Sequence, residues 1–192
     1  MITIKKMKEA DIPALQACPD ISAFALEDGY FRQCYDLQEN GDRQIFVAFD
    51  ADERPAGYVI LNFKPRYALY RKLAMPEIQD LNVRPAYRRQ GIGKALLDLC
   101  EEMVKTMEYG AVGVSVGLHD GFGPAQQLYV RRGYVPDGNG VTYDREPVTR
   151  HEMRPVDDDL CLMMVKELGR VYYDLFVLLL VRFLPVFYMV LR

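Results

Sequence analysis

The sequence has no tryptophan, two histidines and four cysteines among its 192 residues, and these low counts exclude several kinds of site. The cysteines are far apart, no pair has Cys-x-x-Cys spacing, and neither histidine stands at metal-ligand spacing from another ligand. Structural zinc sites and disulfide frameworks depend on such spacings. We therefore predict that the protein has neither. The residues concerned are Cys18, Cys34, Cys100, Cys161, His119 and His151.

We also expect no leader segment, and the sequence has no strong charge of one sign. No apolar run follows the first charged residues, Lys5 and Lys6, so the chain does not begin like a secretory signal peptide. Isolated thiols without such a leader indicate a reducing, cytoplasmic compartment. The net charge is −3, which offers no general surface for nucleic acid. Any anion site must therefore be local.

The residues that are present indicate one globular α/β domain. Half of them are hydrophobic and 27% are charged, as in a folded chain, and the length suits a single domain. The hydrophobic pattern predicts strand, helix, strand, helix and strand in the middle of the chain, beginning with a parallel crossover unit. These segments are 77–83, 91–107, 111–116, 124–132 and 160–166, preceded by strands at 1–5, 44–49 and 56–63, helices at 8–17 and 21–39, and an irregular basic stretch at 65–75. The segment 136–140 is predicted to be a turn.

A glycine-rich turn opens the helix at 91–107. It reads Arg88-Arg-Gln-Gly-Ile-Gly-Lys94, and with Arg84 it gathers four basic residues in an acidic chain. Glycines allow a tight turn, while the free N–H groups and the dipole at a helix start attract phosphate. A Walker A loop would need glycine in place of Arg88, and a dinucleotide fingerprint would need glycine in place of Leu96. We predict that the turn binds phosphate in a third way, with an ordinary helix start carrying solvated basic residues as the alternative.

Two motifs resemble the GNAT N-acetyltransferase superfamily. The turn matches the family signature Arg/Gln-x-x-Gly-x-Gly/Ala through its first arginine and its two glycines. A later stretch, Ala125-x-x-Leu-Tyr129-x-x-x-Gly-Tyr, matches the family pattern Asn-x-x-Ala-x-x-Leu-Tyr-x-x-x-Gly-Phe/Tyr, except that Phe122 stands where the family has asparagine. Gln126 is the nearby side chain that we expect to replace that amide.

The resemblance implies a single GNAT-type acyl-CoA N-acyltransferase domain over residues 1–168. This is an α/β (mixed α+β) fold with a central, mostly antiparallel, splayed sheet flanked by helices. In the family, the turn binds the pyrophosphate of the co-substrate acetyl-CoA, and the preceding strand pairs with the pantetheine arm and polarises the thioester carbonyl through a backbone N–H. The residues that the resemblance assigns to acetyl-CoA are Leu81, Asn82, Val83, Arg88, Arg89, Gln90, Gly91, Ile92, Gly93, Lys94 and Gln126.

The resemblance also implies direct attack of a primary amine on acetyl-CoA in a ternary complex. In the family, the tyrosine that matches Tyr129 protonates the departing thiolate. A phenol of pKa ~10 that gives its proton to a thiolate of pKa ~8.5 does so uphill by about 2 kcal/mol, and a site that lowers the phenol's pKa would ease this step. Asp80 and Glu77 are candidate bases for the amine, with ordinary paired or solvated carboxylates as the alternative. We interpret His119 as an exposed loop residue.

No motif identifies the acceptor. We expect a small-molecule or peptide amine, bound by the early helices from Phe24 to Tyr35 and by the loop from Arg66 to Lys72. A rival hypothesis is a non-catalytic acyl-CoA-binding sensor or structural module, which the phenylalanine at position 122 and the lack of an obvious base favour. An enzyme with a different acyl donor is a further alternative.

Residues 169–192 form an apolar extension beyond the resemblance. Apart from its ends, its charged residues are Asp174 and Arg182, and Pro185 interrupts it. We predict that it packs on the protein or on a second subunit, which would give a homodimer. Membrane association and a peculiarity of the reading frame are the alternatives. Against a membrane span, Arg182 near its centre would cost about 3 kcal/mol.

Overall fold

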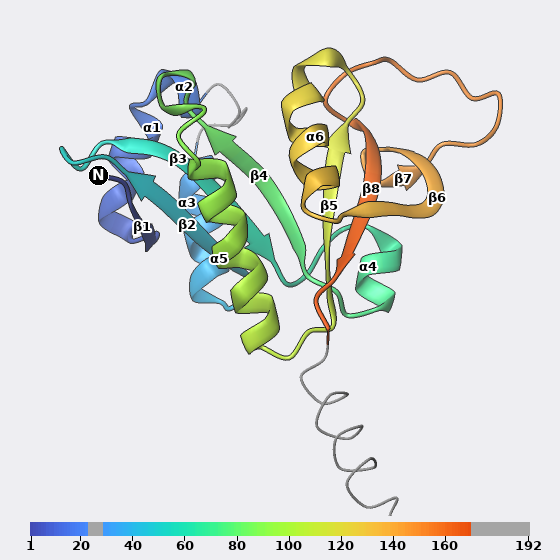
Figure 1. Cartoon of the computed structure of the whole chain (residues 1–192), viewed down its shortest axis with the longest axis horizontal. Coiled ribbons are helices and arrows are strands. Elements are labelled where there is room, and N and C mark those ends of the chain that lie inside the picture. The colour runs from blue at the N-terminus through green and yellow to red at the C-terminus, as the bar shows by residue number, and fades with distance from the viewer. Residues whose placement is uncertain (23–28, 170–192) are drawn as a thin grey trace, which may run out of the picture.

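The computed structural model describes residues 1–22 and 29–169, which form one eight-stranded sheet with helices on both faces (Figure 1). The strand order is β1-β2-β3-β4-β5-β8-β6-β7, and among these strands only β4 and β5 run parallel. The strands are β1 (Thr3–Lys6), β2 (Arg43–Phe49), β3 (Pro55–Asn62), β4 (Glu77–Val83), β5 (Ala111–Gly117), β6 (Val135–Tyr143), β7 (Glu146–Pro147) and β8 (Leu160–Glu167). The helices are η1 (Glu9–Asp11), α1 (Ile12–Gln16), α2 (Pro19–Ser22), α3 (Tyr30–Glu39), α4 (Ala68–Lys72), η2 (Pro85–Tyr87), α5 (Ile92–Thr106), η3 (Asp120–Phe122) and α6 (Gly123–Arg131). The predicted mixed, mostly antiparallel sheet is confirmed.

The middle of the chain folds as the sequence predicts, because its long helix has one continuous apolar stripe. β4, α5 and β5 form the parallel crossover unit. The apolar residues of α5 recur at helical spacing, so they meet the sheet together and join strand residues in one core cluster. The buried apolar residues of this stripe are Ile92, Leu96, Leu97, Cys100 and Val104.

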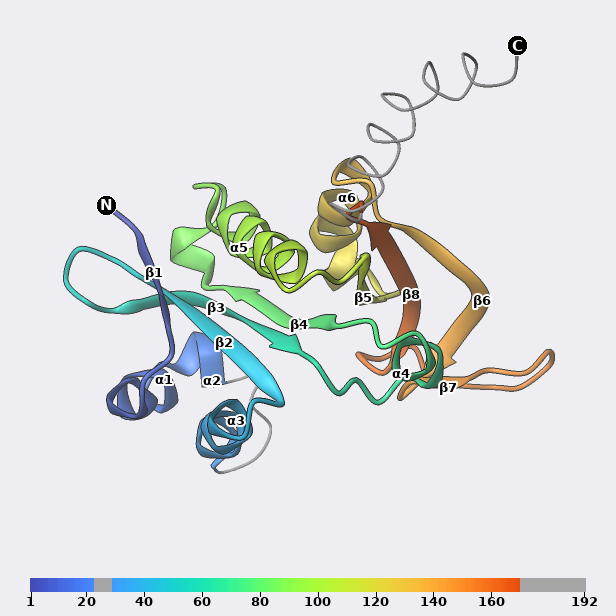
Figure 2. The same cartoon turned by 90° about the horizontal axis from the view of Figure 1, so that it is seen from below.

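Helices cover both faces of the sheet (Figure 2). α5 and α6 lie on one face, the α5 face, and share a core cluster with Val114 of β5. α1 and α3 lie on the opposite face, the α3 face, where Phe31 packs edge-on against Tyr58 of β3. α4 covers the α3 face farther along, and its Tyr70 ring fills the space above Gly113 of β5. The gap between β4 and β5 therefore lies between the helices of the two faces.

β4 and β5 separate after a short paired stretch. They pair only at Glu77 with Gly113 and at Ile78 with Val114, and the two strands then diverge (Figure 1). On its other side β4 stays paired with β3 but carries a bulge, where Asp80 has a φ of 51°. From residue 79 to residue 83 the β5-facing edge of β4 has no strand partner among the described residues. This is the splayed sheet that the resemblance implies.

The prediction of a turn at residues 136–140 was wrong, because this segment lies inside β6. The pairing of β6 with β8 jumps between Pro136 and Val141, so the backbone leaves the ladder and rejoins it. Gly138 and Gly140 take positive φ there. Proline and glycine indicate a turn in the local sequence. Residues before and after this segment both pair with β8, however, so the whole stretch is one strand with a bulge. The sequence also did not predict β7 or α4.

Two predicted features lie outside the described residues. The predicted helix at 21–39 corresponds to α2 and α3, with Phe24 in the gap between the described ranges. The apolar extension is described only at Gly169. Within the described ranges, no helix is long and apolar enough to cross a membrane.

Candidate active site

The turn between η2 and α5 presents a row of free backbone donors. Gly91 caps the helix with a φ of 82°, and Arg89 also has a positive φ of 65°. Within residues 1–22 and 29–169, the N–H groups of residues 89–94 donate to no acceptor. Free N–H groups at the start of a fifteen-residue helix bind anions, because the helix dipole adds partial positive charge at the same end.

The four basic residues of this region have different surroundings. Arg84 is bound inside the protein: it donates to the Pro55 carbonyl (3.0 Å) and lies 3.4 Å from an Asp20 carboxylate oxygen. Arg88 donates from Nε to the Val83 carbonyl (3.0 Å), and Lys94 pairs with an aspartate one turn along α5. Arg89 has no side-chain contact of this kind within the described part of the chain and is exposed. Arg89 therefore has the cation best available to an anion at the turn.

The unpartnered edge of β4 runs directly into this turn. Asn82 is buried, Leu81 and Val83 are half-buried, and η2 connects the strand to the helix start. A Cβ atom placed on Gly93 would lie 3.7 Å from the Val83 side chain and 3.9 Å from that of Leu128. The end of β4, the first turn of α5 and α6 therefore converge at one place. The structure thus brings together the residues predicted for the co-substrate, from 81 to 83 and from 88 to 94.

Tyr129 projects from α6 into the core beside this convergence. Its side chain is 5% exposed and packs edge-on against Tyr134, with ring centroids 5.5 Å apart. Its hydroxyl makes no hydrogen bond among the described residues. The hydroxyl oxygen is not fully buried, since Glu77 Oε1 is the only fully buried side-chain oxygen or nitrogen among these residues that has no partner. Burial raises the pKa of the Tyr129 phenol, and the negative charge of Asp80 adds to this rise. The lowered pKa that would ease proton transfer is therefore not what this site provides.

The two candidate bases differ in access. Asp80 is exposed at the bulge and accepts a hydrogen bond from the Tyr30 hydroxyl of α3. Glu77 is completely enclosed, with one oxygen bound by the Gln79 amide (2.9 Å) and the other 3.6 Å from the Arg145 guanidinium. Burial raises the pKa of Glu77, and the Arg145 charge opposes this rise. Asp80 can meet an incoming amine directly, whereas Glu77 acts at most through other groups.

The loop after β5 is fixed by internal contacts. Gln126 donates from its amide nitrogen to the Gly117 carbonyl (2.8 Å), so this donor already has a partner. The Phe122 ring covers Gly117, where an added Cβ would come within 2.4 Å of it. His119 accepts from the Gly121 N–H (3.1 Å) and contacts Asp158 (2.7 Å), a hydrogen bond that raises the pKa of His119. His119 therefore lies in a loop, as predicted, but it is half-buried rather than exposed, because these contacts hold its imidazole against the loop.

Sequence reasoning included Tyr30 only as part of the predicted acceptor range from Phe24 to Tyr35, without its contact with Asp80, and it missed Arg145. Tyr30 reaches Asp80 from 50 positions away, and Arg145 reaches Ser115 from 30 positions away. Neither residue belongs to a motif. The pair Asp144-Arg145 lacks the glycine that marks a tight hairpin turn, so nothing in the local sequence indicates a hairpin at this place.

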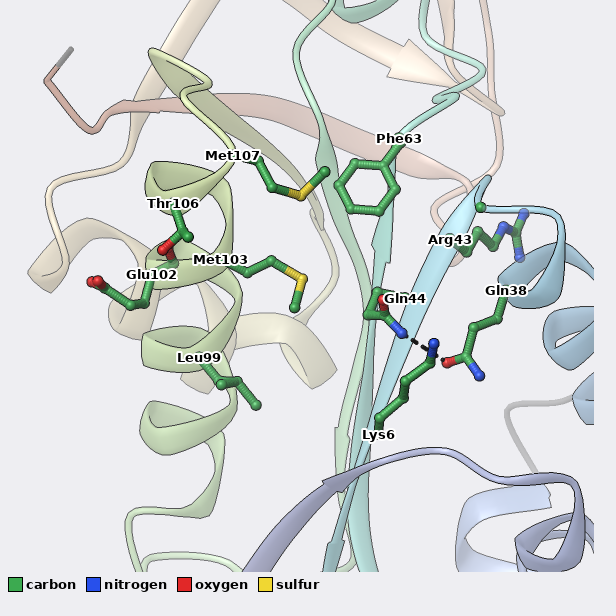
Figure 3. Close-up of a pocket in the computed structure, with 11 residues that line it drawn as sticks. Lys6, Gln38, Arg43, Gln44, Phe63, Leu99, Glu102, Met103, Thr106 and Met107 are labelled. Atoms are coloured by element: carbon green, nitrogen blue, oxygen red, sulfur yellow. Dashed lines mark hydrogen bonds between the residues drawn. The ribbon is translucent and has the colours of Figure 1, made fainter. Parts of the chain in front are cut away.

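Another hollow, of about 570 Å³, lies along the C-terminal half of α5 (Figure 3). Its walls come from α3, α5, β1 and β2 and from the residues just after α5 and β3, and they include Leu99, Met103, Met107 and Phe63. None of the predicted site residues lines it, and the helix start with the free N–H groups is at the opposite end of α5. Within the described residues, no group of three or more potential ligands could hold a metal ion.

Comparison with known proteins agrees with this geometry. The model of the acetyltransferase (GNAT) family matches residues 11–134. A GNAT acetyltransferase structure from Staphylococcus aureus Mu50 superposes with a TM-score of 0.59 at 17% identity, over 88% of this chain and 100% of that chain. The ribosomal-protein-S18-alanine N-acetyltransferase of Escherichia coli gives 0.63 at 17% identity, over 89% and 96%. A ribosomal-protein-alanine N-acetyltransferase of Brucella melitensis gives 0.62 at 18% identity, over 86% and 99%.

These structural matches share the fold at low identity, and the search of curated proteins found no match. The family match covers more than half of the sequence, from α1 to the end of the second motif. It includes β4, the glycine turn and Tyr129, which are the elements that converge at the gap between β4 and β5. The chain therefore belongs to the GNAT acetyltransferase family.

Proposed function

We propose that this protein transfers an acetyl group from acetyl-CoA to a primary amine by direct attack in a ternary complex. The observation that carries the proposal is the row of free N–H groups at residues 89–94, which follows directly on the unpartnered edge of β4. A diphosphate fits the first feature and an extended amide-containing arm fits the second. No other described part of the chain combines the two.

The backbone binds the co-substrate in this proposal. The N–H groups of residues 89–94 and the Arg89 guanidinium hold the diphosphate. The edge of β4 at Leu81 and Val83 pairs with the pantetheine arm, which places the thioester beside the bulge at Asp80. A backbone N–H at the bulge donates to the thioester oxygen and stabilises the negative charge that develops there.

The acceptor amine approaches from the α3 face. Asp80 takes the proton of the ammonium group, directly or through water, and the free amine attacks the carbonyl carbon. As the new C–N bond forms and the C–S bond breaks, the thiolate accepts a proton from the Tyr129 hydroxyl. The new amide nitrogen then loses its second proton through water to the Tyr129 phenolate, and Asp80 releases its proton to solvent, so that amide, thiol and one proton leave the restored site. Glu77 is buried and does not meet the amine; its carboxylate holds the side chains of Gln79 and Arg145 in place beside the gap. The E. coli relative is named for an alanine of a ribosomal protein, so a peptide amine and a small-molecule amine are both candidate acceptors.

Three further features belong to the proposal. The reaction needs no metal ion, because the turn and the bulge supply the electrostatic stabilisation. The protein works in the cytoplasm, as its isolated cysteines, all buried, indicate. The extension at 169–192 packs against a second copy and makes a homodimer. A chelator should leave the turnover number unchanged. A loss of activity on chelation would contradict the proposal that the reaction needs no metal ion.

The proposal is tested by free thiol release from acetyl-CoA across a panel of amines. Acceptor-dependent release is the expected result, and calorimetric titration should show saturable binding that Gly91→Ala weakens. The alternative, a non-catalytic acyl-CoA-binding module, is favoured by the apolar Phe122, which packs on Gly117 in place of the family's amide. Saturable binding with no acceptor-dependent release would establish the alternative.

A further inference from the structure

Arg145 lies in an unusual hairpin turn. The turn between β6 and β7 has two residues, Asp144 and Arg145, since Tyr143 pairs with Glu146. Both turn residues have positive φ, 48° and 68°. Hairpins of this kind favour asparagine and glycine, because a left-handed backbone strains a residue that has a Cβ. An arginine at the second position is therefore strained, and strain of this kind is common where a side chain has a functional role.

The side chain of Arg145 points back to the place where the sheet divides. Its Nη2 donates to Ser115 Oγ (3.2 Å), and its Nε lies 3.6 Å from Glu77 Oε1. Only 21% of the side chain is exposed. Glu77 belongs to the last paired stretch of β4 with β5, and Ser115 follows that stretch on β5. The guanidinium therefore sits beside the apex of the gap, on the α3 face.

This guanidinium has spare binding capacity. Arginine has five N–H donors, and one of them makes a hydrogen bond within the described residues. Glu77 Oε1 is buried and accepts no hydrogen bond, so the nearby ion pair is not closed by a direct bond. A planar guanidinium with free donors suits bidentate binding of a carboxylate.

Two opposite charges lie in order along β4 on this face. The Arg145 guanidinium is beside Glu77 and Ser115, and Asp80 follows at the bulge, where Tyr30 contacts it from α3. A molecule with a cationic amine and an anionic group a few bonds away matches this order.

We propose that Arg145 binds the carboxylate of the acceptor, so that the acceptor is an amino acid or another molecule with a carboxylate close to its amine. The inference rests on the proposed acetyl transfer and adds its substrate class. Asp80 meets the ammonium group at the bulge, while Arg145, fixed by Ser115 and Glu77, holds the carboxylate at the apex. The strained turn aims Arg145 at this place.

Matched acceptor pairs test the proposal. The full chain is assayed for thiol release from acetyl-CoA with arginine against agmatine, lysine against cadaverine, and tyrosine against tyramine. Each pair differs by the carboxylate. For at least one pair, we expect kcat/KM to be at least tenfold higher for the amino acid. Arg145→Gln should remove most of this preference through KM, and Arg145→Lys should restore part of it. Arg131→Gln, an exposed arginine on α6, is the matched control and should keep the preference.

Each outcome decides. Equal rates within every pair, faster reaction of the decarboxylated amines, or a preference that survives Arg145→Gln would overturn the role of Arg145 and leave acetyl transfer standing. No release with any acceptor would overturn the proposed function and this inference with it. If Arg145→Gln fails to fold because Glu77 is left as a lone buried charge, Glu77→Gln is added to neutralise it. The preference is then measured in the double variant, where its survival again counts against the proposal.

Discussion

Because Tyr129 is almost completely buried, desolvation raises the pKa of its phenol above the ordinary value. The same dry surroundings disfavour a thiolate, so the pKa of a leaving thiol at this place rises as well. The two shifts partly cancel in the proton transfer. The phenol also keeps its proton over the whole neutral range, which is the state that an acid needs before it acts.

Tyr129→Phe should therefore lower the turnover number at least tenfold and leave the affinity for acetyl-CoA nearly unchanged. The change removes one oxygen that has no hydrogen-bond partner among the described residues, so the packing against Tyr134 is kept. Steady-state kinetics give the turnover number and calorimetric titration gives the affinity. Tyr109→Phe, which stacks on Phe63 and is not one of the site residues, is the control. An unchanged turnover number would remove Tyr129 from the mechanism.

At the scale of elements, the start of α5 depends on one left-handed glycine. Gly91 has a φ of 82°, and an added Cβ would meet no atom within 4 Å. Gly91→Ala therefore adds backbone strain without a clash, and we expect it to cost about 1 kcal/mol of stability. Because the N–H row would tilt, KM for acetyl-CoA should rise several-fold while kcat changes little.

A matched glycine separates the two effects of this substitution. Gly41, in the turn between α3 and β2, has a φ of 78° and equally open space. Gly41→Ala should cost a similar amount of stability, measured by urea unfolding, and should leave KM for acetyl-CoA unchanged. If both variants raised KM alike, the turn at α5 would have no special part in binding.

Glu101 joins three elements around the second motif. Its carboxylate on α5 accepts from Arg132 after α6 (2.8 Å), from Lys166 of β8 (2.7 Å) and from the Tyr134 hydroxyl (3.1 Å). Burial raises the pKa of Glu101, but the hydrogen bonds from Arg132 and Lys166 outweigh this and lower it overall. The pair of cations thus fixes the end of α6 and, through Tyr134, the ring of Tyr129.

Glu101→Gln should lower the free energy of unfolding by about 2 kcal/mol at pH 7, because the largely buried Lys166 loses its partner and Arg132 keeps only its ion pair with Asp98. A carboxylate whose folded pKa is lowered stabilises the fold above its unfolded pKa of about 4.3, and this contribution is lost as the pH falls through the folded value. The difference between the two proteins should therefore shrink in acid. Urea unfolding from pH 7 to pH 3 measures it, with the exposed neighbour Glu102→Gln as control. A gap that stayed constant with pH would contradict the role of the charge.

At the scale of the whole molecule, local signals predicted what local chemistry decides. The apolar stripe of α5 and the glycine turn predicted the order β4, α5, β5, and the turn predicted where a diphosphate would bind. The pairing of the excursion in β6, the contact of Tyr30 with Asp80 and the position of Arg145 depend on segments far apart in sequence. Side chains on the α3 face are brought together by the fold alone, so no spacing in the sequence could reveal them.

The extension at 169–192 gives the last prediction, because about twenty apolar residues need a cover. In a membrane, about thirteen Leu, Phe and Val residues at about 0.45 kcal/mol each would contribute about 6 kcal/mol against about 3 kcal/mol for Arg182, so the energy of transfer allows insertion. Pro185, however, interrupts any helix that would span. A second copy would cover the same apolar surface without exposing Arg182 to lipid. In sedimentation without detergent, the full chain should therefore run as a soluble dimer and a chain ending at Gly169 as a monomer. A full chain that pellets with lipid vesicles, or that stays monomeric, would contradict the dimer.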